Sequence, residues 1–179
     1  MQKKNKGLVI VYTGDGKGKT TAALGMALRA AGHGKKILIV QFIKNFRNYG
    51  ELKFVKKYDC GIKIKSIGKG YVKIKGDKFP FEEHVKAAKG ALKFAKEGIL
   101  SKEHDIVVLD EINIALDKKL LTLQEVVELI HQKPPSLHLV LTGRNAPKKL
   151  LQLADLVSEI KDIKHPYRKG IPAQKGIEY

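Results

Sequence analysis

A glycine-rich segment between a strand-like run and an apolar run constrains this chain more than any other feature. Residues 13–21 read Thr-Gly-Asp-Gly-Lys-Gly-Lys-Thr-Thr, after the β-branched run 7–12 and before the apolar run 22–31. The segment ends as the phosphate-loop pattern G-x-x-x-x-G-K-[ST] does, although Thr13 stands at the first glycine of that pattern. A buried strand, a glycine loop and a buried helix in this order predict a nucleotide-binding βαβ unit.

The residue types of this loop suit a bound triphosphate. The glycines at 14, 16 and 18 permit positive φ angles and close approach of the backbone, so that successive N–H groups can face an anion. Lys19 can reach phosphate oxygens, the Thr20 hydroxyl can ligate Mg²⁺, and the following helix directs its positive end at the phosphates. We therefore expect ATP to be bound by Thr13, Gly14, Asp15, Gly16, Lys17, Gly18, Lys19, Thr20 and Thr21.

The rest of the chain alternates between apolar runs and helix-like segments. Buried strands are predicted at 36–42, 106–109 and 137–141, a last strand at 156–160, and half-exposed strands at 62–65 and 72–75. Helices are predicted at 50–58, from Pro80 to residue 99, from the capping box at Thr122 to residue 132, and after Pro147. The pattern predicts an α/β fold with three layers, a mostly parallel sheet flanked by helices. No linker or repeat interrupts it, so we expect residues 1–179 to form a single domain.

Charged side chains follow two of the predicted strands. Asp110 and Glu111 follow the strand at 106–109, and Arg144 follows the strand at 137–141. The carboxyl ends of parallel strands share one edge of a sheet, where ligands bind in open α/β folds. Carboxylates there can serve Mg²⁺ near a phosphate loop, and an arginine can stabilise a phosphate. The alternatives are a surface acidic pair that caps the next segment and an exposed loop arginine.

The excess of positive charge favours binding of anions but does not indicate which kind of anion is bound. Thirty-five Lys and Arg against 18 Asp and Glu give a net charge of +17, which suits nucleotide phosphates, nucleic acid or an acidic partner protein. A solvated strand face accounts for the lysine-rich stretch 53–78. The single cysteine, Cys60, excludes an internal disulfide and a cysteine-cluster metal site. No apolar run approaches the roughly 20 residues that span a bilayer, and no secretion signal is apparent, so we expect a cytoplasmic protein with no membrane partner.

Longer motifs resemble one protein family. They are residues 13–25, 32–35, 40–44, 107–112, 141–144 and 154–159, and the ending from Lys164-His-Pro to Ala173-Gln-Lys-Gly-Ile-Glu-Tyr179. In order, and over nearly the whole chain, they resemble the P-loop-type ATP:cob(I)alamin (corrinoid) adenosyltransferases. The resemblance implies the RecA-type architecture of P-loop NTPases. It also implies that the 5′-deoxyadenosyl group of ATP passes to the Co(I) centre of a reduced corrinoid, which releases triphosphate and gives adenosylcobalamin or another adenosylcobamide.

The resemblance also implies roles for particular residues. The expected catalytic residues are Lys19, Glu111 and Arg144. The expected metal side, for the Mg²⁺ that accompanies ATP, is Thr20, Asp110 and Glu111. Well-known members carry Gly-Phe-Thr-Trp where this chain has Gly68-Lys69-Gly70-Tyr71, so the corrinoid substrate is expected at Lys69 and Tyr71. A homodimer is implied as well, and the positive surface would suit an acidic, flavodoxin-type reductant.

Two other functions stay open on the residues alone. A basic P-loop ATPase acting on nucleic acid would release phosphate and bind a polymer in a salt-sensitive way. A small-molecule kinase would release ADP and would need an acceptor base. No aromatic-rich stacking platform or second motor domain is visible, so we do not expect nucleic acid as a partner. The product separates the three functions: triphosphate, phosphate or ADP.

Overall fold

A single parallel sheet organises the fold. The computed structural model describes residues 6–45, 49–74 and 76–179. Its six strands have the order β3-β2-β4-β5-β1-β6, and every neighbouring pair is parallel. They are β1 (Val9–Thr13), β2 (Ile37–Gln41), β3 (Ile62–Ser66), β4 (Ile106–Asp110), β5 (His138–Thr142) and β6 (Leu156–Glu159). The predicted α/β class with a parallel sheet is confirmed.

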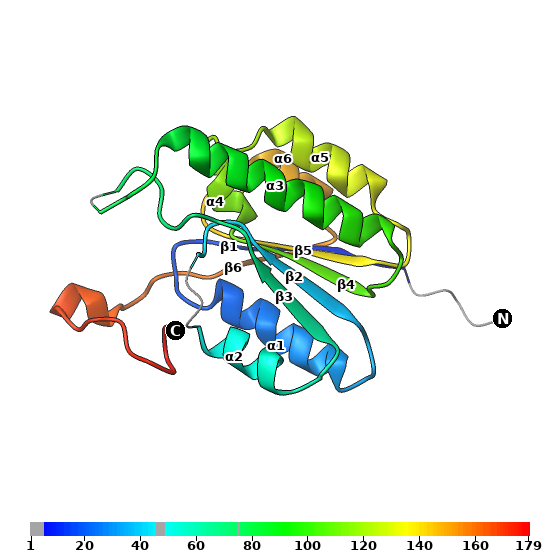
Figure 1. Ribbon diagram of the computed structural model, residues 1–179, viewed down its shortest axis with the longest axis horizontal. Helices are drawn as coiled ribbons and strands as arrows, with labels where there is room; N and C mark the ends of the chain where they lie inside the picture. Colours follow the sequence, from blue (N-terminus) through cyan, green and yellow to red (C-terminus); the bar gives the residue numbers. More distant parts are fainter. Residues whose placement is uncertain (1–5, 46–48, 75) are drawn as a thin grey trace.

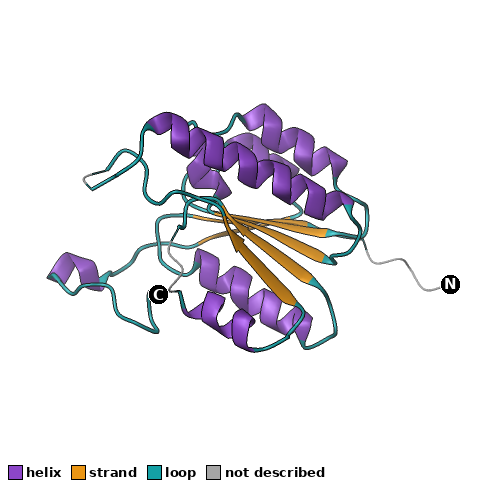
Figure 2. Ribbon diagram, viewed as in Figure 1, coloured by secondary structure: helices purple, strands orange, loops and turns teal. Residues whose placement is uncertain are grey.

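Helices cover both faces of this sheet (Figure 1). Helices α1 (Lys19–Ala31) and α2 (Gly50–Lys57) lie on one face. On the other face lie α3 (Phe81–Leu100), α4 (Ile112–Asp117), α5 (Leu123–Gln132) and α6 (Lys148–Leu153). Figure 2 shows the resulting three layers, helices above and below the strands. Across the described ranges, no helix combines the length and the apolar character needed to cross a membrane.

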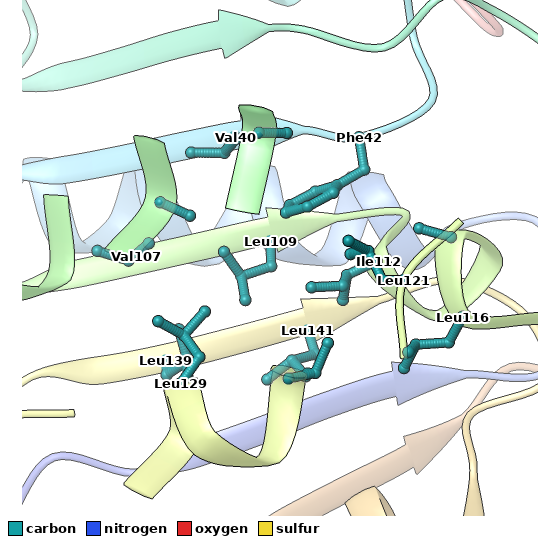
Figure 3. Close-up of a cluster of buried hydrophobic side chains, with 14 of the residues drawn as sticks. Val40, Phe42, Val107, Leu109, Ile112, Leu116, Leu121, Leu129, Leu139 and Leu141 are labelled. Atoms are coloured by element: carbon teal, nitrogen blue, oxygen red, sulfur yellow. The ribbon is translucent and has the colours of Figure 1, made fainter. Parts of the chain in front are cut away.

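The central strands are buried on both faces because their side chains alternate between two cores. In β1, Val9 and Val11 point into the core under α3 to α6, whereas Ile10 points into the core under α1. The larger core takes alternate residues of four central strands and apolar residues of the helices (Figure 3). Burial of each such side chain contributes roughly 1.5–3 kcal/mol to folding. Continuous β-branched runs therefore become interior strands here, as the sequence pattern predicts.

The strand order determines what can meet at the carboxyl edge of the sheet. Strand β5 lies between β1, which leads into the glycine-rich loop, and β4, which ends at Asp110. The chain leaves β1 for α1 on one face and leaves β5 for α6 on the other face. Such a switch opens a crevice between neighbouring strand ends, where ligands of α/β proteins bind. The candidate site lies at this switch.

Several predicted elements need correction. Residues 72–74 are not a strand: Val72 is buried, Lys73 has a φ of 54°, and the Lys73 N–H donates to Asp77 Oδ2 at 2.9 Å. The period-two alternation was misleading there, because this run pairs with no strand of the described sheet. Lys75 lies outside the described residues.

The helices also differ from the prediction. Helix α1 buries only one face and leaves Leu28 58% exposed. Two short helices, α4 and the 3-10 turn η1 (Pro166–Lys169), were not predicted.

Candidate functional site

The glycine-rich loop is shaped by a close contact with the chain that follows β6. Gly14 and Gly18 have φ angles of +95° and +123°, which side-chain-bearing residues rarely adopt. A Cβ on Gly14 would lie 2.4 Å from the Ile160 carbonyl oxygen, and one on Gly16 would lie 2.5 Å from the Lys161 carbonyl oxygen. The Gly16 N–H also donates to Ile160 O at 2.7 Å. The glycines are therefore required by this contact as well as by backbone conformation.

Lys19 folds back into the loop that precedes it. Its side chain is buried, and Nζ donates to Gly14 O at 2.7 Å and to Gly16 O at 2.6 Å. Burial lowers the pKa of Lys19, and the positive charge of Arg144 adds to this effect, while the Glu111 carboxylate opposes it. The ammonium group thus lies at the start of α1 with carbonyl partners that an anionic ligand can replace.

Asp110 is the centre of a hydrogen-bond network at the end of β4. Its side chain is fully buried. Oδ1 accepts hydrogen bonds from the hydroxyls of Thr20 and Thr142, each at 2.8 Å. Oδ2 accepts a hydrogen bond from Gln41 Nε2 at 3.3 Å and lies 3.4 Å from Lys44 Nζ. This burial excludes the alternative of a surface acidic pair, because the carboxylate is satisfied entirely within the site.

Lys44 carries a positive charge into the same network from the chain that follows β2. Its Nζ also lies 3.2 Å from Glu51 Oε1 and 4.8 Å from the ring centroid of Tyr49. Burial disfavours the ammonium, but the Asp110 and Glu51 carboxylates together hold the pKa of Lys44 above its usual range. Lys44 therefore stays charged and offsets the buried Asp110 carboxylate.

Glu111 adopts an unusual backbone conformation beside Asp110. Its φ of 65° places it in the left-handed region, at the N-cap of α4, and its N–H donates to Thr142 Oγ1 at 2.9 Å. Burial, followed by the neighbouring Asp110 carboxylate, raises the pKa of Glu111 to about 7, although Lys19 opposes the shift. Gly143 makes room for the carboxylate, because a Cβ there would lie 3.2 Å from Glu111 Oε2. Strained backbone and perturbed carboxyl groups often occur together at functional sites, so Glu111 stays a candidate site residue.

Arg144 is exposed, yet it belongs to the site. It lines a cavity of about 490 Å³ between the glycine-rich loop and the C-terminal segment, together with Asp15, Glu159, Lys161, Asp162 and Arg168. Lys17, on the same loop, pairs with Glu178 of that segment, with 2.5 Å between Nζ and Oε1.

The two threonines at the ends of the predicted nucleotide loop differ in burial. Thr13 is buried and accepts a hydrogen bond from the Ala146 N–H, whereas Thr21 is exposed on the first turn of α1. The predicted nucleotide residues thus surround the start of α1.

The segment predicted to bind the corrinoid is attached to the chain after β2. Its Gly70 N–H donates to Ile43 O at 2.8 Å, and Asn45 Nδ2 donates to Lys69 O at 2.7 Å. A Cβ on Gly68 would lie 2.4 Å from Ile43 O, so only glycine allows this approach. Figure 1 shows the chain between β3 and α3 projecting from the same edge of the sheet as the glycine-rich loop.

Lys69 and Tyr71 differ in their surroundings. Tyr71 is 64% exposed and available to a flat ligand. Lys69 Nζ lies 3.6 Å from Glu83 Oε2 and 4.9 Å from the ring centroid of Phe79. An aromatic ring from the chain just before α3 is therefore present beside Lys69, where the resembling family carries a phenylalanine. The sequence analysis missed Phe79, because nothing in the local pattern links it to residue 69.

Gln41, Lys44 and Thr142 are the other site residues that the sequence analysis did not assign. Gln41 and Thr142 each end a strand directly after a run of apolar residues, and both side chains are buried. A polar residue at the carboxyl end of a predicted buried strand is the signal that could have found both. Lys44 gave no comparable signal among the many lysines of this chain.

The donor set near Thr20 fits a cation that arrives with phosphate oxygens. Within residues 6–45, 49–74 and 76–179, no group of three or more His, Cys, Asp or Glu could hold a metal ion alone. Thr20, Asp110 and Glu111 nevertheless supply oxygen atoms in one place, and Mg²⁺ prefers oxygen ligands and commonly shares them with a nucleotide. The side chains present are thus compatible with Mg²⁺ bound together with ATP.

Comparisons with known proteins show the family of the chain and its fold. A family model described as "ATP:corrinoid adenosyltransferase BtuR/CobO/CobP" matches residues 5–179. A corrinoid adenosyltransferase from a Sinorhizobium species is 43% identical over 97% of this chain and 81% of its own length. Those from Pseudomonas aeruginosa and Escherichia coli K12 are each 37% identical over 97% of this chain and cover 84% and 86% of their own lengths. The fold is similar to that of a KaiC-like protein from Pyrococcus horikoshii, with a TM-score of 0.52 and 19% identity over 89% of this chain and 74% of that protein.

Proposed function

The chain belongs to the ATP:corrinoid adenosyltransferase family BtuR/CobO/CobP, and on this premise we propose how its site transfers the 5′-deoxyadenosyl group of ATP to a reduced corrinoid. One observation supports the proposal above all others. Lys19 and Thr20 at the start of α1 lie at the same sheet edge as Asp110, Glu111 and the segment 67–71. A nucleotide and a large flat substrate can therefore meet there.

The glycine-rich loop stabilises the leaving triphosphate. Cobalt(I) is itself a strong nucleophile, so attack on C5′ of the ribose requires no protein base, and the carbon–oxygen bond to the triphosphate breaks as the cobalt–carbon bond forms. Lys19 exchanges its contacts with Gly14 O and Gly16 O for phosphate oxygens. The added negative charge offsets the burial that lowers the pKa of Lys19. Groups held in place before the reaction can stabilise developing charge without reorganising.

Thr20, Asp110 and Glu111 form the metal side of the site. Because the Thr20 O–H donates a hydrogen bond to Asp110, the lone pairs of its oxygen stay available for a cation. Asp110 is fully buried, so it acts by orienting Thr20. Mg²⁺ bound with ATP supplies positive charge that offsets the triphosphate. Glu111 has a pKa of about 7, so a bound ligand can change its protonation near neutral pH. A cation favours the ionised carboxylate, and a phosphate favours the protonated acid.

Arg144 and the segment 67–71 complete the arrangement. Arg144 is exposed beside the loop, and its guanidinium can pair with phosphate oxygens in a bidentate way. Tyr71 presents an exposed ring to the corrinoid, and Lys69, beside Phe79, can approach the acidic or amide groups at the edge of that substrate. These side chains orient C5′ and cobalt toward each other, which is the main task left to the protein.

The test is an anaerobic assay of product identity. The protein is mixed with MgATP and chemically reduced cobalamin, and the visible spectrum is followed for a photolabile alkyl-cobalt product. Adenosylcobalamin and triphosphate are expected, and Lys19→Ala should slow their formation by about 100-fold or more. Lys56→Ala, at an exposed position of α2, is the matched control and should retain full activity. Formation of phosphate or ADP with an unchanged corrinoid spectrum would refute the proposal.

A reductant, a homodimer and a cytoplasmic location complete the proposal. The net charge of +17 supports docking of an acidic, flavodoxin-type electron donor. Binding that is equally strong at low and high salt would argue against such docking. The family resemblance supports a homodimer of single-domain subunits, and the single sheet of the described residues supports one domain. Sedimentation equilibrium at several protein concentrations measures the oligomeric state.

A further inference from the structure

Gln41 occupies the centre of the carboxyl edge of the sheet. It is the last residue of β2, and in the strand register it lies opposite Ser66 of β3 on one side and Asp110 of β4 on the other. Its side chain is fully buried and spans both neighbours. Ser66 Oγ donates to Gln41 Oε1 at 2.5 Å, and Gln41 Nε2 donates to Asp110 Oδ2 at 3.3 Å.

The main chain of Gln41 holds the beginning of the segment 67–71. Its carbonyl oxygen accepts hydrogen bonds from the N–H groups of Ile67 and Gly68, at 3.1 and 3.4 Å. Ser66, which donates to the side chain of Gln41, directly precedes this segment. One residue therefore touches the carboxylate that orients Thr20 and also the chain that leads to Lys69 and Tyr71.

We propose that Gln41 is a positioning residue that couples the nucleotide site to the corrinoid segment, an inference that rests on the proposed function. ATP that binds at Thr20 also fixes Asp110, because the Thr20 hydroxyl donates to it. Asp110 then holds the Gln41 amide in one orientation, and the Gln41 amide holds Ser66. The segment 67–71 is thus ordered for the second substrate once the first is bound.

The chemistry of the bridge explains why glutamine is required. The bridge needs an acceptor toward Ser66 and a donor toward Asp110, and the glutamine amide supplies both. Glutamate would place a second buried carboxylate against Asp110 and would lack the donor. Asparagine is one methylene shorter and cannot span both neighbours. Methionine fills a similar volume but supplies neither strong hydrogen bond.

Amide hydrogen exchange measured by NMR tests the coupling without any corrinoid. MgATP is the probe, and the amides of Ile67 and Gly68 are the reporters. In the unmodified protein, MgATP should slow exchange at these amides by about two- to tenfold, the range expected for a change of one hydrogen bond. In Gln41→Met this slowing should disappear, while MgATP still protects the glycine-rich loop.

Variants of Ser66 keep the test valid if the buried substitution disturbs folding. Ser66 is only half-buried, so Ser66→Ala should fold normally and should also lose the MgATP-dependent slowing. Ser66→Thr retains a hydroxyl and should restore it. Lys63→Ala, at an exposed position on the same strand, is the control and should behave as the unmodified protein does. With reduced cobalamin, Ser66→Ala should raise the KM for the corrinoid several-fold and leave that for ATP within about twofold.

The outcomes separate this inference from the proposed function. The coupling is overturned if MgATP does not change amide exchange at Ile67 and Gly68. It is also overturned if MgATP slows this exchange as much in Gln41→Met and Ser66→Ala as in the unmodified protein. Both conclusions hold even if adenosylcobalamin forms. An MgATP response that disappears in both variants supports the coupling even if the protein transfers no adenosyl group. In that second case only the proposed function fails.

Discussion

Substitution of Glu111 by glutamine should stabilise the protein at neutral pH while it impairs the site. The folded protein holds this carboxyl at a pKa of about 7, against 4.5 for the ordinary group, chiefly because of burial and then because of Asp110. Between these values the folded state binds more protons than the unfolded state. Stability therefore falls as pH rises from about 4.5 to about 7 and levels off above that range.

The expected size follows from the pKa difference. At pH 8 the buried carboxylate is ionised and destabilises the folded state by about 3 kcal/mol. Glutamine has nearly the same shape and carries no charge, so Glu111→Gln removes this penalty. At pH 4 the carboxyl is protonated in the folded state, and the variant and the unmodified protein should differ little. For a chain of this length, 3 kcal/mol corresponds to an increase in Tm of about 6–12 °C.

Urea unfolding followed by circular dichroism at pH 4, 6, 7 and 8 measures this difference. Glu82→Gln, at an exposed position of α3, is the matched control and should change stability little at any of these pH values. The adenosyl-transfer rate of Glu111→Gln should fall, because a neutral amide replaces the carboxylate that the proposed metal side uses. A stability difference that is the same at all four pH values would refute the reasoning from burial.

Substitutions at four further positions test other parts of the structure. Thr20→Val removes a hydroxyl that donates to Asp110, and it should raise the KM for ATP by about tenfold or more in steady-state assays, whereas Thr20→Ser should retain activity. Gly143→Ala should destabilise the protein by about 1–3 kcal/mol in urea unfolding, because φ is +126° and the new Cβ would lie 3.0 Å from Asn113 Cβ. Gly25→Ala, in α1 with open space around its Cβ, should instead stabilise it by about 0.5–1 kcal/mol. Thr122→Ala removes the capping box of α5 and should lower stability by about 1 kcal/mol with no effect on adenosyl transfer.

The nucleotide half of the site could be predicted from sequence because its residues are contiguous. Residues 13–20 contain the glycines, the lysine and the threonine that a phosphate loop requires, and the flanking strand and helix have clear periodicities. The carboxyl-edge positions of Asp110 and Arg144 followed from the rule that parallel strands share an edge. Their precise roles in binding and chemistry stay predictions until the assays above are made.

The predicted strand at 72–75 shows where local pattern fails. Alternating lysines and apolar residues suit a half-exposed strand, but a strand also needs a neighbour with free hydrogen-bonding groups. The chain at 67–71 is instead held by Gln41 and Ile43, and residues 72–74 continue as a bend. Periodicity reports which side chains could share a face, but it does not report whether a partner strand is present.

The sequence by itself determined the class of the fold, the phosphate loop and the family, because these depend on runs of neighbouring residues and on motifs in a set order. Only the tertiary structure decided that β5 lies between β1 and β4, and that Gln41, Lys44 and Thr142 converge on Asp110. These contacts join residues separated by 32 to 69 positions in the chain. Their geometry depends on strand order and on burial of both faces of the sheet, which no local stretch of sequence records.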